Sequence, residues 1–146
     1  MKFLFASDSF KGTLSSEQII RLLTESAKEA FPDCETAGTL IADGGEGTVD
    51  AVIAMTKGEL IRVPVHGPLM EETTAVYGKI NEDSAIIEMA AASGLPMVPE
   101  NLRNPLNTTT YGTGELIRDA LDRGFRNISV ALGGSATNDG GMGAMS

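Results

Sequence analysis

Glycines, carboxylates and hydroxyls concentrate in three segments of this sequence, at residues 7–14, 42–48 and 133–141. Glycine allows the backbone to approach a ligand closely, and the backbone N–H groups can then donate to an anion. Carboxylates can hold Mg²⁺ or orient an attacking hydroxyl, and a lysine can place a positive charge beside a phosphate. These are the residue types that phosphoryl transfer requires, so the three segments predict a site for a phosphorylated ligand.

The common phosphate-binding motifs are absent from these segments. Neither glycine cluster contains the Gly-Lys-Ser/Thr of a Walker loop, and no Gly-x-Gly-x-x-Gly follows the first apolar run. The paired Asp-x-Asp of some phosphatases is also missing, because residues 7–14 contain one aspartate. Taken alone, residues 44–47 fit a tight turn as well as a ligand loop. The site interpretation therefore depends on the three segments lying at one edge of a sheet.

The predicted elements of the first part of the chain place these segments after strands. Apolar runs predict strands at residues 2–6 and 35–41. Between them, Ser15 and Gln18 predict the capping box at the start of a helix. We therefore expect a parallel β-α-β unit, after which the first glycine cluster leads into a second helix. In open α/β sheets, ligands bind at the carboxyl ends of the strands.

The second part of the chain predicts a mixed sheet. Residues 59–65, 73–80 and 84–89 partly alternate in polarity and predict an antiparallel meander. The elements that follow are a loop-like stretch from residue 90, a helix over about 114–123, a strand at 127–132 and the start of a helix capped by Asn138 or Asp139. The predicted fold is α/β, with a Rossmann-like parallel β-α-β core over about residues 1–58 and a mixed α/β segment over about 59–146.

The composition is that of a globular chain of about one domain, with 146 residues of which 42% are hydrophobic and 21% charged. The net charge is −9 and no basic stripe is present, which argues against nucleic-acid binding. No stretch approaches the ~20 apolar residues of a membrane span. Cys34 is the one cysteine, so an intrachain disulfide is excluded, and we expect a cytoplasmic protein.

Four segments resemble the bacterial glycerate kinase family in order and spacing: residues 7–12, 42–48, 104–115 and 133–143. Residues 88–95 resemble a further block of that family. The resemblance implies two α/β domains, one of them Rossmann-like, with the site in the cleft. It also implies ATP-dependent phosphorylation of D-glycerate, to 2-phosphoglycerate in this branch, with ATP and Mg²⁺ as cofactors. Family members are more than twice as long, so the chain resembles the N-terminal part of one.

The residues of the three segments, together with Thr113, receive candidate roles from their chemistry and from this resemblance. The candidate catalytic residues are Asp8, Lys11 and Asp139; Lys11 would pair with a phosphate or the glycerate carboxylate, and Asp139 would bind Mg²⁺ or accept the glycerate hydroxyl proton. The candidate metal ligands are Glu46 and Asp43, which also fits a turn. The candidate substrate- and phosphate-binding residues are Ser7, Ser9, Gly44, Gly45, Gly47, Thr48, Thr113, Gly133, Gly134, Ser135 and Asn138.

The charged candidates also have structural alternatives. Asp8 fits a turn cap, Lys11 a solvated loop and Asp139 a helix N-cap. Glu115 either favours the dipole of its helix or reaches the site. His66 precedes a Gly-Pro turn and is interpreted as a turn residue, not as a base.

Two other functions fit the same residues. The chain could be a non-catalytic module that binds an anion or a nucleotide, or it could belong to a kinase of another small sugar acid. The motifs do not assign ATP and glycerate to particular loops. Because a strand, a glycine loop and the start of a helix come last, we expect the isolated chain to lack glycerate kinase activity. We also expect it to self-associate through incompletely covered apolar residues such as Ile128, Val130 and Leu132.

Overall fold

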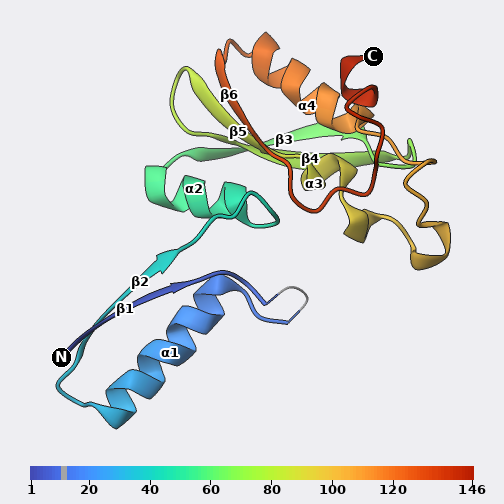
Figure 1. Ribbon diagram of the computed structural model, residues 1–146. Helices are drawn as coiled ribbons and strands as arrows, with labels where there is room; N and C mark the ends of the chain where they lie inside the picture. The colour runs from blue at the N-terminus through green and yellow to red at the C-terminus, as the bar shows by residue number, and fades with distance from the viewer. Residues whose placement is uncertain (11–12) are drawn as a thin grey trace. The chain divides into compact units, whose positions relative to one another are not determined.

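The computed structural model describes residues 1–10 and 13–146, which form two compact units, Met1–Asp43 and Gly44–Ser146. Figure 1 shows the order of helices and strands along the chain. Each unit has its own sheet, and the strands are parallel in one unit and mixed in the other. The predicted mixed α/β class is confirmed.

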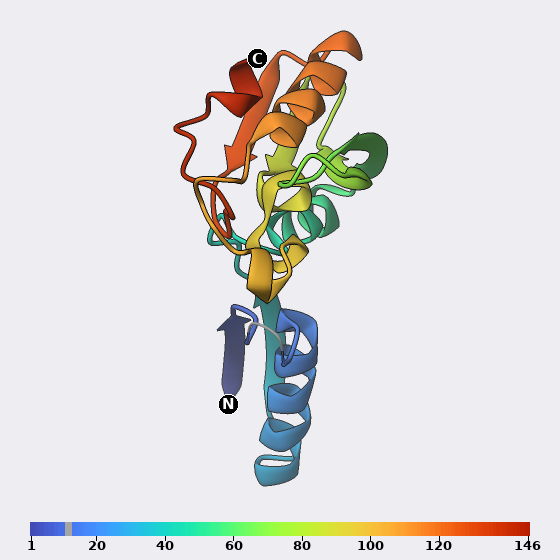
Figure 2. The ribbon, with the colours of Figure 1, turned by 90° about the vertical axis from the view of Figure 1, so that its right-hand side faces the viewer.

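The first unit is the predicted β-α-β arrangement. β1 (Lys2–Ser7) and β2 (Glu35–Leu40) pair in parallel, and α1 (Ser16–Ala30) packs along both strands, as Figure 2 shows. At the start of α1 the Gln18 N–H donates to Ser15 Oγ at 3.2 Å, and the Ser15 N–H donates to Gln18 Oε1 at 2.9 Å. The predicted capping box is therefore confirmed.

The second unit is built on a four-stranded sheet. Its strands, in order across the sheet, are β3 (Glu59–His66), β4 (Glu72–Lys79), β5 (Ser84–Glu88) and β6 (Asn127–Ala131). β4 pairs antiparallel with both of its neighbours, whereas β5 and β6 are parallel. The predicted meander is confirmed. Because β3, β5 and β6 run in one direction, their carboxyl ends share one edge of the sheet.

Helices cover both faces of this sheet. They are α2 (Thr48–Thr56), α3 (Ala90–Ser93) and α4 (Tyr111–Asp122), with 3-10 turns at Leu95–Met97, Glu100–Leu102 and Gly143–Met145. α3 and α4 pack on the face that carries Tyr77 and Ile87, where Leu116 of α4 is fully buried. α2 packs on the opposite face (Figure 1). There the Ile53 side chain lies against Gly78 of β4. Among the residues that the structure describes, no helix combines the length and the apolar character needed to span a membrane.

Three helical details differ from the prediction. α3 replaces the start of the expected loop, because alanine favours helix and the helix buries its own residue Ala92 completely. α4 begins at Tyr111, about three residues early, since the Asp139 carboxylate binds the N–H and hydroxyl of Thr110 just before it. In place of the helix expected after Asn138, the structure has a turn followed by the 3-10 turn Gly143–Met145. The Asp139 carboxylate binds Thr110, at the start of α4, and so does not cap a helix of its own.

The boundary between the two units lies between Asp43 and Gly44, whereas the sequence placed the end of the Rossmann-like segment at about residue 58. The difference concerns α2. This helix packs on β4 and β5, so it belongs to the second unit together with the glycine loop that precedes it.

Candidate functional site

Two glycine loops meet at the carboxyl edge of the sheet in the second unit. Residues 44–47 precede α2, and residues 133–135 follow β6. The Gly133 N–H donates to the Gly44 carbonyl oxygen at 2.8 Å. A Cβ added to Gly133 would lie 2.6 Å from the Cα of Gly45, a distance at which the backbone must move. The close approach of the two loops therefore requires glycine at position 133.

Glu88, the last residue of β5, connects loop 44–47 to the sheet. Its Oε1 accepts from the Val49 N–H at 2.7 Å, and the Gly47 amide also interacts with this carboxylate. Gly47 is the N-cap residue of α2, with φ 89°, and it has no side chain that could cap the helix. Glu88 therefore supplies, from a neighbouring strand, the cap that the sequence of α2 lacks.

The environment of the Glu88 carboxylate disfavours its charge. Burial raises the pKa of Glu88 above its ordinary value, and the nearby carboxylates of Asp50 and Glu46 raise it further. The amides of Val49 and Gly47 oppose this shift without cancelling it. Folding consequently favours the protonated form of Glu88, and the ionised form costs stability at neutral pH.

The backbone amides of the two loops differ in their partners. In the first loop the Gly44 N–H donates to Thr48 Oγ1 at 3.1 Å, and the amides at the start of α2 bind Glu88. In the second loop the N–H groups of Gly134 and Ser135 donate no hydrogen bond to any residue that the structure describes. The second loop therefore presents two backbone donors beside the first loop, and Gly134 does so with a φ of 77°.

Asp139 holds the segment after the second loop against the start of α4. Its Oδ2 accepts from the Thr110 N–H at 2.8 Å, the Thr110 hydroxyl at 2.9 Å and the Gly143 N–H at 3.2 Å. Its Oδ1 accepts from the Gly141 N–H at 2.9 Å. Burial alone would raise the pKa of Asp139, but these donors outweigh burial and hold it below the ordinary value. A carboxylate bound in this way is an anchor and a weak proton acceptor.

Three other predicted binding residues lie in this unit. Thr113 is 3% exposed, and its Oγ1 lies 2.9 Å from Ser93 Oγ. Ser135 Oγ donates to the Thr137 carbonyl at 3.2 Å, which closes a local turn. Asn138 is exposed. The structure thus places Thr113 in the core beside α3, while Ser135 and Asn138 lie in the loop after β6.

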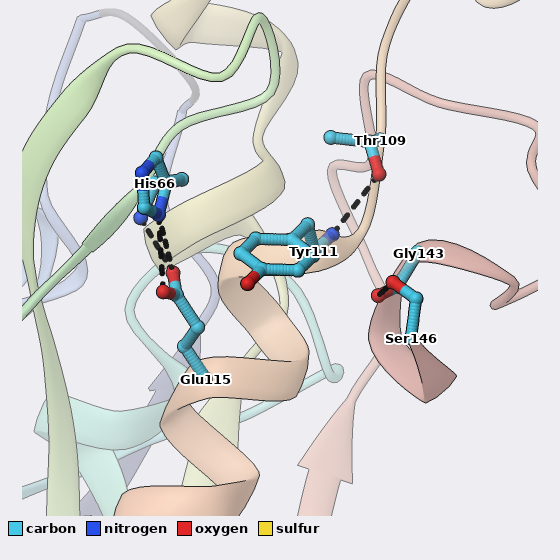
Figure 3. Close-up of polar contacts among 6 residues, drawn as sticks. All are labelled: His66, Thr109, Tyr111, Glu115, Gly143 and Ser146. Atoms are coloured by element: carbon cyan, nitrogen blue, oxygen red, sulfur yellow. Dashed lines mark hydrogen bonds and ion pairs between the residues drawn. The ribbon is translucent and has the colours of Figure 1, made fainter.

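A histidine–glutamate pair lies at the carboxyl end of β3, as Figure 3 shows. The His66 N–H donates to Glu115 Oε2 at 2.7 Å, and the ring Nδ1 lies 3.0 Å from Glu115 Oε1. Tyr111 packs edge to face against the imidazole, with 5.4 Å between ring centres. The pair borders an open cavity of about 470 Å³ that Glu72 and Thr73 also line. Glu115 therefore fastens the amino-terminal half of α4 to β3.

The candidates Ser7, Asp8 and Ser9 lie at the end of β1, in the two-stranded sheet of the first unit, so the expectation that all three segments lie at one edge of a sheet is wrong. The Ser9 N–H donates to Asp8 Oδ1 at 2.7 Å, and the Ser7 hydroxyl donates to the Asp8 carbonyl at 2.9 Å. Both bonds are local and define a turn directly after β1. Lys11, the candidate for an anion contact, lies outside the described residues.

The predicted metal ligands Asp43 and Glu46 are both exposed. Within residues 1–10 and 13–146, no group of three or more His, Cys, Asp or Glu side chains could hold a metal ion. Mg²⁺ commonly binds through one or two carboxylates together with water and substrate phosphates, so it needs no such group.

Sequence reasoning missed Glu88 as a site residue, although it opens the block at residues 88–95. One signal was available in the sequence. Gly47 precedes α2 without a capping side chain, so the helix needed an acceptor from elsewhere. A glutamate that ends a strand, directly after the buried residues Ile86 and Ile87, can supply that acceptor with its carboxylate oxygen.

Comparisons with known proteins agree on one family. The model of the glycerate kinase family matches residues 3–146. The glycerate 2-kinase of Escherichia coli K12 is 49% identical over 144 residues, which are 98% of this chain and 38% of the relative. The glycerate kinase of Haemophilus influenzae Rd is 47% identical over 146 residues, 99% of this chain and 39% of the relative.

A solved structure extends the comparison to the fold. The crystal structure of a protein from Salmonella typhimurium LT2, assigned as glycerate kinase 2, matches with a TM-score of 0.78 and 48% identity. The match covers 99% of this chain and 39% of that one, so the chain spans about two fifths of the length of these relatives. Since the family model and the relatives match nearly every residue, the chain belongs to the glycerate kinase family.

Proposed function

We propose that the protein containing this chain transfers the γ-phosphoryl group of ATP to a hydroxyl of D-glycerate, giving ADP and a phosphoglycerate. The observation that carries the proposal is the contact of loops 44–47 and 133–135 at the carboxyl edge of the sheet. Relatives named glycerate kinase support glycerate as the acceptor. The relative named glycerate 2-kinase supports 2-phosphoglycerate as the product.

We assign phosphate binding to the second loop. The N–H groups of Gly134 and Ser135 have no acceptor among the described residues, and an anion beside them would satisfy both. The amides at the start of α2 already bind the Glu88 carboxylate, so loop 44–47 is better suited to positioning than to phosphate binding.

The exposed carboxylates of Asp43 and Glu46 are the candidates for contact with Mg²⁺, because this ion prefers carboxylate oxygens. Bound Mg²⁺ would neutralise charge on the phosphates of the nucleotide. Asp8 and Lys11 stay candidate catalytic residues. An aspartate can accept the hydroxyl proton as the new O–P bond forms, and a lysine can pair with a carboxylate or a phosphate.

The experiment is a coupled ADP-release assay on a protein of the relatives' length that carries this chain. We expect ADP release that depends on D-glycerate, and ³¹P NMR of the product identifies the phosphorylated hydroxyl. A panel of other small sugar acids, assayed at equal concentration, tests the alternative substrate class. MgATP binding without turnover of any acceptor would overturn the kinase proposal and favour a binding module.

A further inference from the structure

We propose that Glu88 is a positioning residue of this kinase site: its carboxylate fixes loop 44–47 against loop 133–135 by binding the amides at the start of α2. The inference rests on the proposed function. It concerns a residue that acts through the first glycine loop, by accepting from the backbone amides of Val49 and Gly47.

The contact joins segments that are distant in the sequence. Glu88 and Val49 are 39 residues apart, and their atoms Oε1 and N lie 2.7 Å apart. The next residue, Met89, donates its N–H to the Ala131 carbonyl at 2.9 Å, which ties the end of β5 to the end of β6. The backbone next to Glu88 is therefore bound to the end of β6, where the second loop begins, while the Glu88 side chain binds the end of the first loop.

The two loops also depend on each other directly. The Gly133 N–H donates to the Gly44 carbonyl, and the absence of a Cβ at Gly133 allows the approach. A shift of the start of α2 would move Gly44 and hence the point at which residues 133–135 are supported. The contact between Glu88 and the start of α2 thus controls the position of both loops.

Folding stability does not explain why this acceptor is a carboxylate. Burial and the carboxylates of Asp50 and Glu46 disfavour its ionised form, and a glutamine at position 88 would offer the same acceptor oxygen without a charge. A charged acceptor, however, holds an amide more tightly than a neutral one does. A group that fixes a loop at a cost to stability is expected at a functional site.

The test uses Glu88→Gln, Glu88→Asp and Glu88→Ala in the protein of the relatives' length. Gln keeps the acceptor and removes the charge, whereas Asp keeps the charge and withdraws it from Val49 by one methylene. Glu71→Gln is the matched control. Glu71 Oε2 also accepts a backbone N–H, that of Leu69 at 2.9 Å, but in the turn between β3 and β4.

We expect kcat/KM for MgATP to fall about tenfold in Glu88→Gln and about 100-fold in both Glu88→Asp and Glu88→Ala. The free energy of unfolding of Glu88→Gln at neutral pH should equal or exceed that of the wild type. Glu71→Gln should keep wild-type kcat/KM. A purely structural residue would behave differently, because its loss of activity would follow its loss of stability.

Hydrogen exchange gives a readout that does not depend on activity. Exchange in residues 44–50 should accelerate in Glu88→Ala and Glu88→Asp, and should stay unchanged in Glu71→Gln. Wild-type kcat/KM and exchange in all Glu88 variants would overturn the inference. If the wild type itself fails to phosphorylate D-glycerate, the proposed function fails, and the exchange experiment still decides whether Glu88 positions the loop.

Discussion

Replacing Gly133 with alanine tests directly whether the two glycine loops form one structure. The added Cβ would lie 2.6 Å from Gly45 Cα and 2.8 Å from the Gly44 carbonyl oxygen. Both neighbours are backbone atoms, so no side chain can rotate away. The loops must separate by about 0.8 Å to reach an ordinary contact of 3.4 Å, and the hydrogen bond from the Gly133 N–H to Gly44 then stretches.

The magnitude follows from these two effects. Inserting a methyl group into a packed contact costs about 1–3 kcal/mol. Loss of one backbone hydrogen bond adds about 0.5–1.5 kcal/mol. We therefore expect Gly133→Ala to lower the free energy of unfolding by about 2–4 kcal/mol. MgATP binding should weaken by more than the stability loss explains, because the donors at Gly134 and Ser135 move together with residue 133.

The assays are urea unfolding and calorimetric titration with MgATP, on the protein of the relatives' length. Gly124→Ala is the control, because Gly124 has a φ of +98° after α4 and no atom within 4 Å of an added Cβ. That substitution carries the strain of a left-handed backbone alone, about 1–2 kcal/mol. A Gly133→Ala protein that is as stable as Gly124→Ala and binds MgATP normally would refute the reasoning that the loops support one another.

Three further predictions concern other parts of the chain. Asp139→Asn should lower the free energy of unfolding by about 2 kcal/mol at neutral pH. Because the folded-state pKa of Asp139 is depressed, the stability that its carboxylate contributes is present above pH 3.8 and disappears as the pH falls through the folded-state pKa. Urea unfolding at a series of pH values measures this loss. Asp8→Asn should lower kcat at least about 100-fold with little change in folding. Lys11→Ala should weaken binding of the anionic ligand, MgATP or D-glycerate, in a salt-dependent way; normal steady-state kinetics for both variants would reduce this segment to a turn. The 146-residue chain alone should self-associate, because the side chains of Leu4 and Leu132 are 70% and 68% exposed; sedimentation that shows a monomer at all concentrations would contradict this.

The local elements of the fold could be predicted because their determinants are close in the sequence. The capping box at Ser15 and Gln18 spans four residues, and it starts α1 where expected. Gly124 ends α4 with a positive φ, as a C′ glycine should. The start of α4 was missed by about three residues, since it depends on Asp139, which lies 29 residues from Thr110.

The meeting of the glycine loops could not be derived from the strand order. Residues 44–47 follow β2 of the two-stranded sheet, whereas residues 133–135 follow β6 of the four-stranded sheet, so the rule for loops after parallel strands of one sheet does not bring them together. What the sequence could not indicate is which amides of the loops have partners inside the protein. That depends on the packing of α2 over β5, which brings Val49 to Glu88, and such long-range packing leaves no periodic signal in the sequence.

Asp139 and Glu88 show why a carboxylate that binds the amides of a glycine-rich segment has no fixed role. Both accept backbone N–H groups, and both lie beside a helix start. Asp139 receives several donors on its two oxygens, and its pKa falls, so the charge stabilises the fold. Glu88 is half-buried near Asp50 and Glu46, and burial and these carboxylates raise its pKa, so the charge costs stability. The balance of burial, hydrogen-bond donors and acidic neighbours therefore decides whether such a charge stabilises the fold, and this balance exists only once the chain has folded.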